Sequence, residues 1–166
     1  SKPPPAVAAI RPHFASPGSS VTLIADGLVS GASYVAAFRA FGAKRIGVLT
    51  PYRADVNRIV ADYIRARGFD VPVFGSFNEQ DDGTVARITP SSIRAGVNTL
   101  LKTARVDAVF VSCTSVRLAA AAAGIEAETG VPITSSNHAM AWHALRLASV
   151  NDQLPQWGKL FTLPGA

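Results

Sequence analysis

Cysteine is almost absent from this sequence, which has one, Cys113, among 166 residues. A single cysteine excludes an intrachain disulfide framework and a zinc site built from cysteines alone. It also favours a reducing compartment, so we expect a cytoplasmic location. Charged residues are scarce as well, at 16%, whereas hydrophobic residues reach 48%. Disorder of the whole chain needs the opposite balance, so we expect a folded chain of about one domain.

Several recognition patterns are also missing. The sequence has neither a Gly-x-Gly-x-x-Gly segment nor a P-loop, so nucleotide binding has little support. Its most apolar stretch, residues 118–125, is far shorter than the roughly 20 residues of a membrane span, and no signal peptide is recognisable. The net charge is +5, but the 16 Lys and Arg residues are not clustered. We therefore expect neither nucleic acid nor a membrane as a partner.

What the chain does have, from residue 45 onward, is an alternation of two kinds of segment. Short apolar runs at residues 45–50, 71–74, 108–111 and 131–134 predict buried strands. Amphipathic patterns predict helices at residues 55–68, from residue 90 through Leu101, from Ser115 to about Gly124 or on to Gly130, and at residues 137–148. Thr89 and Pro90 mark the start of the second. The fold class that follows is α/β. We expect a parallel sheet of about four to five strands with helices on both faces, a Rossmann-like three-layer arrangement.

The ends of the chain are interpreted separately. Residues 7–14 and 31–41 are predicted to be helical and residues 21–25 to form a strand. We interpret residues 1–43 as a remnant or linking segment, residues 44–150 as the α/β domain and residues 151–166 as a C-terminal tail. Leu160 and Phe161 are expected to pack that tail against the domain.

Polar residues gather where the predicted strands end. Ligands of open α/β sheets bind outside the carboxyl ends of the strands, so these positions are the candidate site. They are residues 50–52, the loop 75–83, residues 113–115 and residues 135–138.

Cys113 is the most informative of these residues. It ends an apolar strand, and the sequence predicts that a helix follows immediately. The amides of residues 114–116 would then point at the sulfur, and the helix dipole would favour a thiolate. Such a cysteine acts as a nucleophile or as an acid/base, and the alternative is a buried structural cysteine.

The other candidates each allow two interpretations. The turn at Ser135, Ser136 and Asn137 presents amides that suit a carboxylate, or it is an ordinary helix cap. The Tyr52 hydroxyl could donate to a carboxylate or an enediolate, or Tyr52 is structural. His138 could line the site, and its spacing of five from His143, which we interpret as an ordinary core or surface residue, does not suit a metal. Asp81 and Asp82 form a carboxylate pair that could act as a base or bind a metal, or they are simply solvated.

Several of these segments resemble the maleate cis–trans isomerases and the ectoine-utilisation proteins. These families belong to the aspartate/glutamate racemase superfamily, together with arylmalonate decarboxylase. The resemblance covers about residues 35–150, and the segments occur in the family's order. They are RIGVLTPY at 45–52, GSF at 75–77, DDGTVARI at 81–88, VSCTSVR at 111–117, SSNHA at 135–139 and WH at 142–143.

The resemblance implies one half of a racemase-type two-domain fold, with the active site between two halves that each bring a cysteine. It implies chemistry beside a carboxylate with no cofactor and no metal, and self-association into a homo-oligomer. In the isomerases a thiolate adds to the double bond of maleate, the carbon–carbon bond rotates and the thiol leaves. Carried over by position, Cys113 is the cysteine of the C-terminal half and Tyr52 is a substrate-binding tyrosine. Asp82 stands where the isomerases have a substrate-binding asparagine.

Two departures from the family pattern shape the prediction. Asp82 would repel a dicarboxylate unless protonated, which favours an acid other than maleate, and most of the N-terminal half with its cysteine would precede residue 1. We predict a cofactor-independent isomerase of a small (di)carboxylic acid in which Cys113 is catalytic. The alternatives are a decarboxylase or amino-acid racemase of the same superfamily, or a non-catalytic carboxylate-binding domain. The predicted substrate-binding residues are Tyr52, Asp82, Thr114, Ser115, Ser136, Asn137 and His138.

Overall fold

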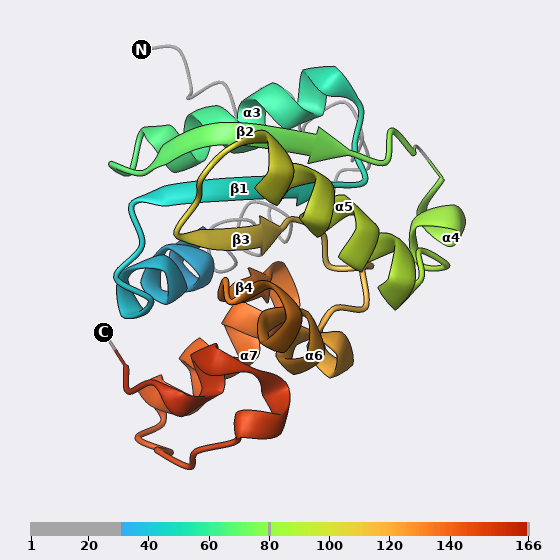
Figure 1. Cartoon of the computed structure of the whole chain (residues 1–166). Coiled ribbons are helices and arrows are strands. Elements are labelled where there is room, and N and C mark those ends of the chain that lie inside the picture. Colours follow the sequence, from blue (N-terminus) through green and yellow to red (C-terminus); the bar gives the residue numbers. More distant parts are fainter. Residues whose placement is uncertain (1–30, 80, 166) are drawn as a thin grey trace, which may run out of the picture.

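The computed structural model describes residues 31–79 and 81–165, and strands and helices alternate along it (Figure 1). The strands are β1 (Arg45–Thr50), β2 (Asp70–Ser76), β3 (Ala108–Val111) and β4 (Ile133–Ser135). The helices are α3 (Ala54–Arg65), α4 (Asp82–Val85), α5 (Pro90–Thr103), α6 (Ala119–Thr129) and α7 (Ser136–Leu147), and two short 3-10 helices follow, η2 (Pro155–Trp157) and η3 (Lys159–Thr162). The predicted α/β alternation is confirmed.

The four strands form one parallel sheet in the order β2-β1-β3-β4. Leu49 of β1 is level with Gly75 of β2 and with Val111 of β3, and Val111 is level with Ser135 of β4. The carboxyl ends of all four strands therefore lie at one edge. From β1 the chain first moves outward to β2 and then returns to build β3 and β4 on the other side. The gap between β1 and β3 is thus the topological switch point of the sheet.

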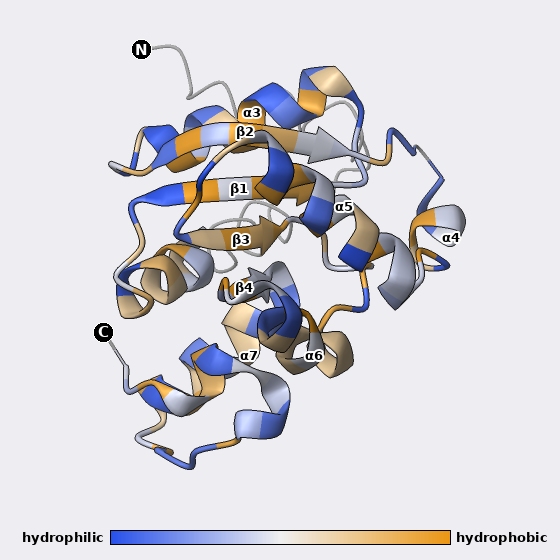
Figure 2. Cartoon of the chain, viewed as in Figure 1, coloured by the Kyte–Doolittle hydropathy of each residue, from blue (hydrophilic) through white to orange (hydrophobic). Residues whose placement is uncertain are grey.

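Each face of the sheet is covered by helices, as predicted. On one face Ile46, Val48 and Phe110 pack against Phe38 of the helical segment 31–40 and against Trp142 of α7. On the other face the core joins the sheet to α5 and α6, through Val109, Val111, Ile93, Val97 and Ile125. Figure 2 shows β3 hydrophobic along its length, as a strand buried on both faces should be. None of the described helices is long and apolar enough to cross a membrane.

The segments at the two ends pack onto this core. The helix expected at residues 31–41 is present over residues 31–40, whereas the elements expected at 7–14 and 21–25 lie outside the described residues. At the other end Leu160 and Phe161 are buried, which confirms the predicted packing of the tail. Arg146 of α7 holds that tail through hydrogen bonds to several of its backbone carbonyls.

Two local predictions were wrong. The helix after Cys113 begins at Ala119 and not at Ser115. Val116 and Leu118 are both buried, and residues two apart share a face in an extended segment but lie about 200° apart on a helix. The loop expected at residues 75–83 also leads into a short helix, α4, because Asp81 caps it by accepting from the backbone N–H of Thr84 at 2.6 Å.

Candidate active site

Two predicted site residues meet at the switch point of the sheet. Tyr52 follows β1, and Cys113 follows β3. Cys113 is 6% exposed, and its sulfur accepts a hydrogen bond from the backbone N–H of Ser115 at 3.3 Å. The Tyr52 hydroxyl lies near enough to the Cys113 side chain for the two to interact, and this interaction contributes to the raised pKa of Tyr52. The structure therefore places a phenol and an amide N–H against one thiol, at the edge where α/β proteins bind ligands.

Tyr52 is a neutral hydrogen-bond donor in this position. Burial raises the pKa of Tyr52 well above its usual range, and the neighbouring Cys113 and the charge of Asp82 raise it further. A protonated phenol at neutral pH can donate to a sulfur or to a carboxylate oxygen. Asp82, at the start of α4, is exposed and lies near enough to act on Tyr52 through its charge.

The loop after Cys113 is tied to the beginning of α7. Because α6 starts only at Ala119, no helix N-terminus adjoins the sulfur, and the predicted helix-dipole effect on Cys113 is wrong. Thr114 is exposed and Ser115 half-buried. The Asn137 side-chain amide donates to the Thr114 carbonyl at 2.5 Å. Asn137 thus joins the first turn of α7 to the loop that follows β3.

At the end of β4 the structure shows a capped helix. Ser135 is the N-cap of α7, and its hydroxyl accepts from the His138 backbone N–H at 3.3 Å. The Ser135 hydroxyl therefore serves as a helix cap. Ser136 is buried as the first residue of α7, so the N-terminus of a 12-residue helix reaches the same sheet edge as Cys113.

Three side chains hold the backbone of Tyr52, and one of them, Asn57, lies outside the strand-end positions that the sequence singled out. Its N–H donates to the Thr50 hydroxyl at 3.2 Å, and its carbonyl accepts from the Asn57 side-chain amide at 2.9 Å and from the Ser76 hydroxyl. Asn57 is only 4% exposed. The helical pattern carried a signal, because Asn57 precedes the buried Ala61 and Ile64 by four and seven residues and so lies on the buried face of α3.

Comparison with known proteins places the chain in a family. The family model described as arylmalonate decarboxylase matches residues 21–161. The chain belongs to the arylmalonate decarboxylase family. The resemblance drawn from the strand-end motifs is confirmed, since curated maleate isomerases are also similar to this chain.

The maleate isomerase of Pseudomonas putida is 29% identical over 140 residues, which are 84% of this chain and 56% of that protein. The arylmalonate decarboxylase of Bordetella bronchiseptica is 28% identical over 125 residues, 74% of this chain and 52% of that protein. A solved structure of the Nocardia farcinica maleate cis–trans isomerase bound to TRIS matches with a TM-score of 0.76 and 26% identity, over 80% of this chain and 54% of that chain. The chain thus spans about half the length of these relatives, and its fold corresponds to one half of the racemase-type architecture.

Within this member of the arylmalonate decarboxylase family, the rings of His138 and His143 are engaged by other partners. His138 is buried, and its Nε2 lies 2.7 Å from the Trp157 carbonyl, to which it donates. Its Nδ1 lies 3.1 Å from the Thr134 hydroxyl, and burial lowers the pKa of His138, so the ring is neutral and accepts there. The ring therefore connects α7 to the tail. His143 contacts Ser33, consistent with the ordinary role expected for it.

The two acidic residues of the loop differ in role. Asp81 accepts from the backbone and hydroxyl of Thr84, and these hydrogen bonds lower the pKa of Asp81. Asp82 makes no such cap and stays exposed beside the Tyr52 end of the site. No group of three or more His, Cys, Asp or Glu residues suited to a metal occurs in residues 31–79 and 81–165.

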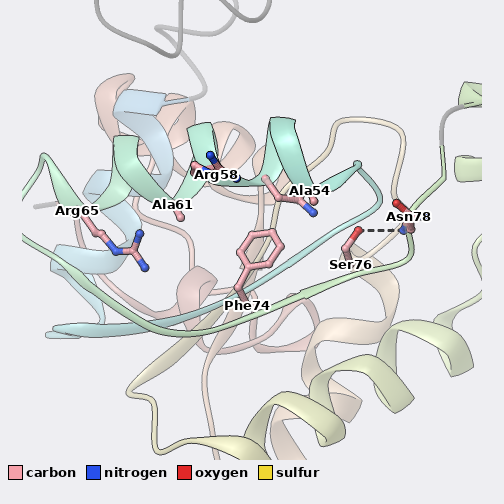
Figure 3. Close-up of a pocket in the computed structure, with 8 residues that line it drawn as sticks. Ala54, Arg58, Ala61, Arg65, Phe74, Ser76 and Asn78 are labelled. Carbon is pink, nitrogen blue, oxygen red and sulfur yellow. Dashed lines mark hydrogen bonds between the residues drawn. The ribbon is translucent and has the colours of Figure 1, made fainter.

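Two hollows in the surface lie away from Cys113. One, of about 430 Å³, runs between α3 and β2 (Figure 3). Phe74 lies between the two elements, with Ser76 and Asn78 toward one end and Arg65 toward the other. The second, of about 560 Å³, lies between the C-terminal part of α6 and the tail. Neither is lined by Cys113 or Tyr52, but the first exposes one side of the network around Asn57 and Ser76 to solvent.

Proposed function

We propose that this chain contributes Cys113 to the active site of an enzyme that isomerises a small carboxylic acid without a cofactor. One observation carries the proposal: Cys113 meets Tyr52 at the switch point of a parallel sheet. There, Ser115 N–H donates to the sulfur at 3.3 Å and a neutral phenol faces it. Two donors directed at one sulfur suit a thiolate as the reacting form.

The chemistry follows from these positions. The Cys113 thiolate adds to one carbon of a double bond conjugated to a carboxylate, and the displaced electron pair is delocalised onto the carboxylate oxygens. Rotation about the resulting single bond and loss of the thiolate restore the double bond in the other geometry. Tyr52 holds a carboxylate oxygen through its hydroxyl. The membership of maleate isomerases among the relatives, one of them solved with maleate, supports this reaction.

The remaining predicted contacts fall into two groups. We propose that four residues beside Cys113 bind the second polar end of the substrate. They are Thr114 and Ser115 in the loop after β3, and Ser136 and Asn137 in the first turn of α7. The α7 N-terminus at Ser136 suits an anion in that place. The ring of His138 has no free nitrogen, so we propose that it supports α7 and does not touch the substrate. Asp82 disfavours a second carboxylate nearby, and we propose an acid whose distal group is neutral or a hydrogen-bond donor.

A decarboxylase is the second candidate, because the matching family model is that of arylmalonate decarboxylase. In that reaction loss of CO₂ leaves a carbanion beside the remaining carboxylate, and the Cys113 thiol delivers its proton to that carbon. A racemase would use the same thiol to exchange a proton at such a carbon. The three reactions share the placement of Cys113 and differ in the substrate.

Selective alkylation tests the proposal directly, because Cys113 is the chain's one cysteine. Intact mass would follow its reaction with iodoacetate from about pH 6 to about pH 9, with and without maleate, an arylmalonate or aspartate. We expect at least one acid to slow alkylation about tenfold at saturation, with Cys113→Ser giving no mass change. Equal rates with every acid, matching those of free cysteine, would refute the proposal. Protection without conversion of the acid in an NMR assay would identify a binding domain.

A further inference from the structure

We infer that Asn57 is a positioning residue of the candidate active site, which sets the place of Tyr52 against Cys113. The inference rests on the proposed function and extends it to a helix outside the strand-end motifs. Asn57 lies in the first turns of α3 and is 4% exposed, and its hydrogen bonds go to Thr50 and Tyr52 and not to Cys113.

Both polar atoms of the Asn57 side-chain amide form hydrogen bonds to the stretch from the end of β1 to the loop before α3. Its Nδ2 donates to the Tyr52 carbonyl at 2.9 Å, and its Oδ1 accepts from the fully buried Thr50 hydroxyl at 2.5 Å. A buried amide is costly unless its donor and acceptor are both satisfied. Here both partners belong to residues 50–52, the stretch that presents Tyr52.

One contact orients the next. Because Oδ1 of Asn57 can only accept, Thr50 must give it the one proton of its hydroxyl. The lone pairs of the Thr50 oxygen are then left for the Tyr52 backbone N–H, which donates to it at 3.2 Å. Asn57 therefore fixes both polar backbone atoms of Tyr52, the carbonyl directly and the N–H through Thr50.

The second strand closes the network. Ser76, at the end of β2, donates its hydroxyl to the same Tyr52 carbonyl and accepts from the Asn78 N–H at 2.9 Å (Figure 3). The Glu79 N–H donates to the Pro51 carbonyl at 2.7 Å. The peptide of Tyr52 cannot rotate without breaking several of these bonds at once. Its side chain, and so the phenol beside Cys113, takes its position from that peptide.

Substitutions in the network should move Tyr52 without unfolding the chain. Asn57→Asp keeps the acceptor for Thr50 but turns an oxygen toward the Tyr52 carbonyl, and Thr50→Val removes the bridging hydroxyl. Thr50→Ser keeps that hydroxyl and is the rescue variant. Thr129→Val is the matched control, because its half-buried hydroxyl bonds only backbone groups, those of Ile125 and Val131, at the far end of α6. Asn57→Ser replaces Asn57→Asp if the latter does not fold.

The readout is ¹⁹F NMR of protein labelled with 3-fluorotyrosine, in which the Tyr52 signal is the one lost in Tyr52→Phe. We expect Asn57→Asp and Thr50→Val to shift or broaden that signal and to change the Cys113 alkylation rate by about threefold or more. Thr50→Ser and Thr129→Val should leave both as in the unsubstituted protein. A Tyr52 signal and an alkylation rate that stay constant in the folded variants would overturn the inference.

This experiment separates the two proposals. The ¹⁹F signal needs no substrate, so a displaced Tyr52 signal supports the positioning role even if no acid protects Cys113. Conversely, protection of the unsubstituted protein by an acid, together with an unmoved Tyr52 signal in both variants, would sink the positioning role and leave the proposed function standing.

Discussion

At the scale of single residues, losing the contact between the Tyr52 phenol and the Cys113 sulfur should have the clearest effect on the reactivity of Cys113. Tyr52→Phe removes a donor from the sulfur and leaves the ring in place. A hydrogen bond to a charged group contributes roughly 1.5–3 kcal/mol, and about 1.4 kcal/mol corresponds to one pH unit. We therefore expect Tyr52→Phe to slow the alkylation of Cys113 by about tenfold in the neutral part of the pH profile. Iodoacetamide, which is uncharged, should be the probe.

Tyr34→Phe is the matched control for that change. Tyr34 is also buried, and burial likewise raises the pKa of Tyr34, but its ring packs on Phe38 and Phe110 in the core. Its substitution should leave the alkylation profile in place. Superimposable profiles for Tyr52→Phe and the unsubstituted protein would contradict the role given to the phenol.

Asp82 sets the charge of the site at the same scale. Asp82→Asn removes a negative charge that acts on Tyr52, so a dicarboxylate should bind better. Two charges about 4 Å apart near a protein surface interact by about 4 kcal/mol, and a greater distance between them or added salt reduces this energy. We therefore expect maleate to protect Cys113 of the Asp82→Asn variant at about a five- to tenfold lower concentration. The gain should shrink in high salt. Asp70→Asn, at the opposite edge of the sheet, is the control, and an equal gain there would refute the assignment.

At the scale of elements, Arg146 joins α7 to the tail. It is 9% exposed, and its guanidinium donates to four backbone carbonyls. Arg146→Met keeps the length of the side chain but leaves those carbonyls without their donor. We expect a loss of about 3 kcal/mol in the free energy of unfolding measured with urea. The exposed Arg39→Met should change it by less than about 0.5 kcal/mol. A similar small loss for Arg146→Met would mean that other contacts hold the tail. The four carbonyls that accept from the Arg146 guanidinium are those of Val150, Asp152, Phe161 and Leu163.

The elements themselves were largely predictable, and the exceptions have physical reasons. The apolar runs around Val48 and Phe110 identify strands, because a strand covered on both faces is hydrophobic throughout. The start of α6 was missed because Ser115 is a residue type that favours helix caps and an alanine-rich run follows it, whereas the buried Val116 and Leu118 lie in an extended segment before α6. Helix α4 was missed because its formation depends on one side chain, Asp81, in a polar stretch.

At the scale of the whole molecule, the strand-end rule located the candidate site but not the contacts within it. The rule brings Tyr52 and Cys113 to one edge, since parallel strands end together. It says nothing of which way a side chain turns. His138 looked available at a helix start, yet the tail that occupies its ring is separated from it by 19 residues. Asn57 was passed over because contacts of a buried amide depend on three-dimensional packing and have no pattern in sequence.

The same histidine links local protonation to the stability of the whole molecule. His138 joins Thr134 of β4 to Trp157 of η2, and burial lowers the pKa of His138 below 6.5. Between that lowered value and 6.5 the unfolded chain binds the proton and the folded chain does not, so the free energy of unfolding rises with pH in this window. The contribution is complete above 6.5 and is lost as the pH falls through the pKa of the folded state.

His138→Gln tests this linkage, because glutamine can still donate to the Trp157 carbonyl and does not titrate. Urea unfolding from about pH 7.5 to about pH 5 should show the unsubstituted protein losing stability relative to this variant as the pH falls. Glu126, whose pKa burial raises, titrates in both proteins and so cancels in the difference. His143→Gln, which removes a half-buried histidine elsewhere on α7, is the control for the loss of an imidazole. If the free energies of unfolding of the unsubstituted protein and of His138→Gln differ by the same amount at every pH, then the ring titrates alike in the folded and unfolded chains.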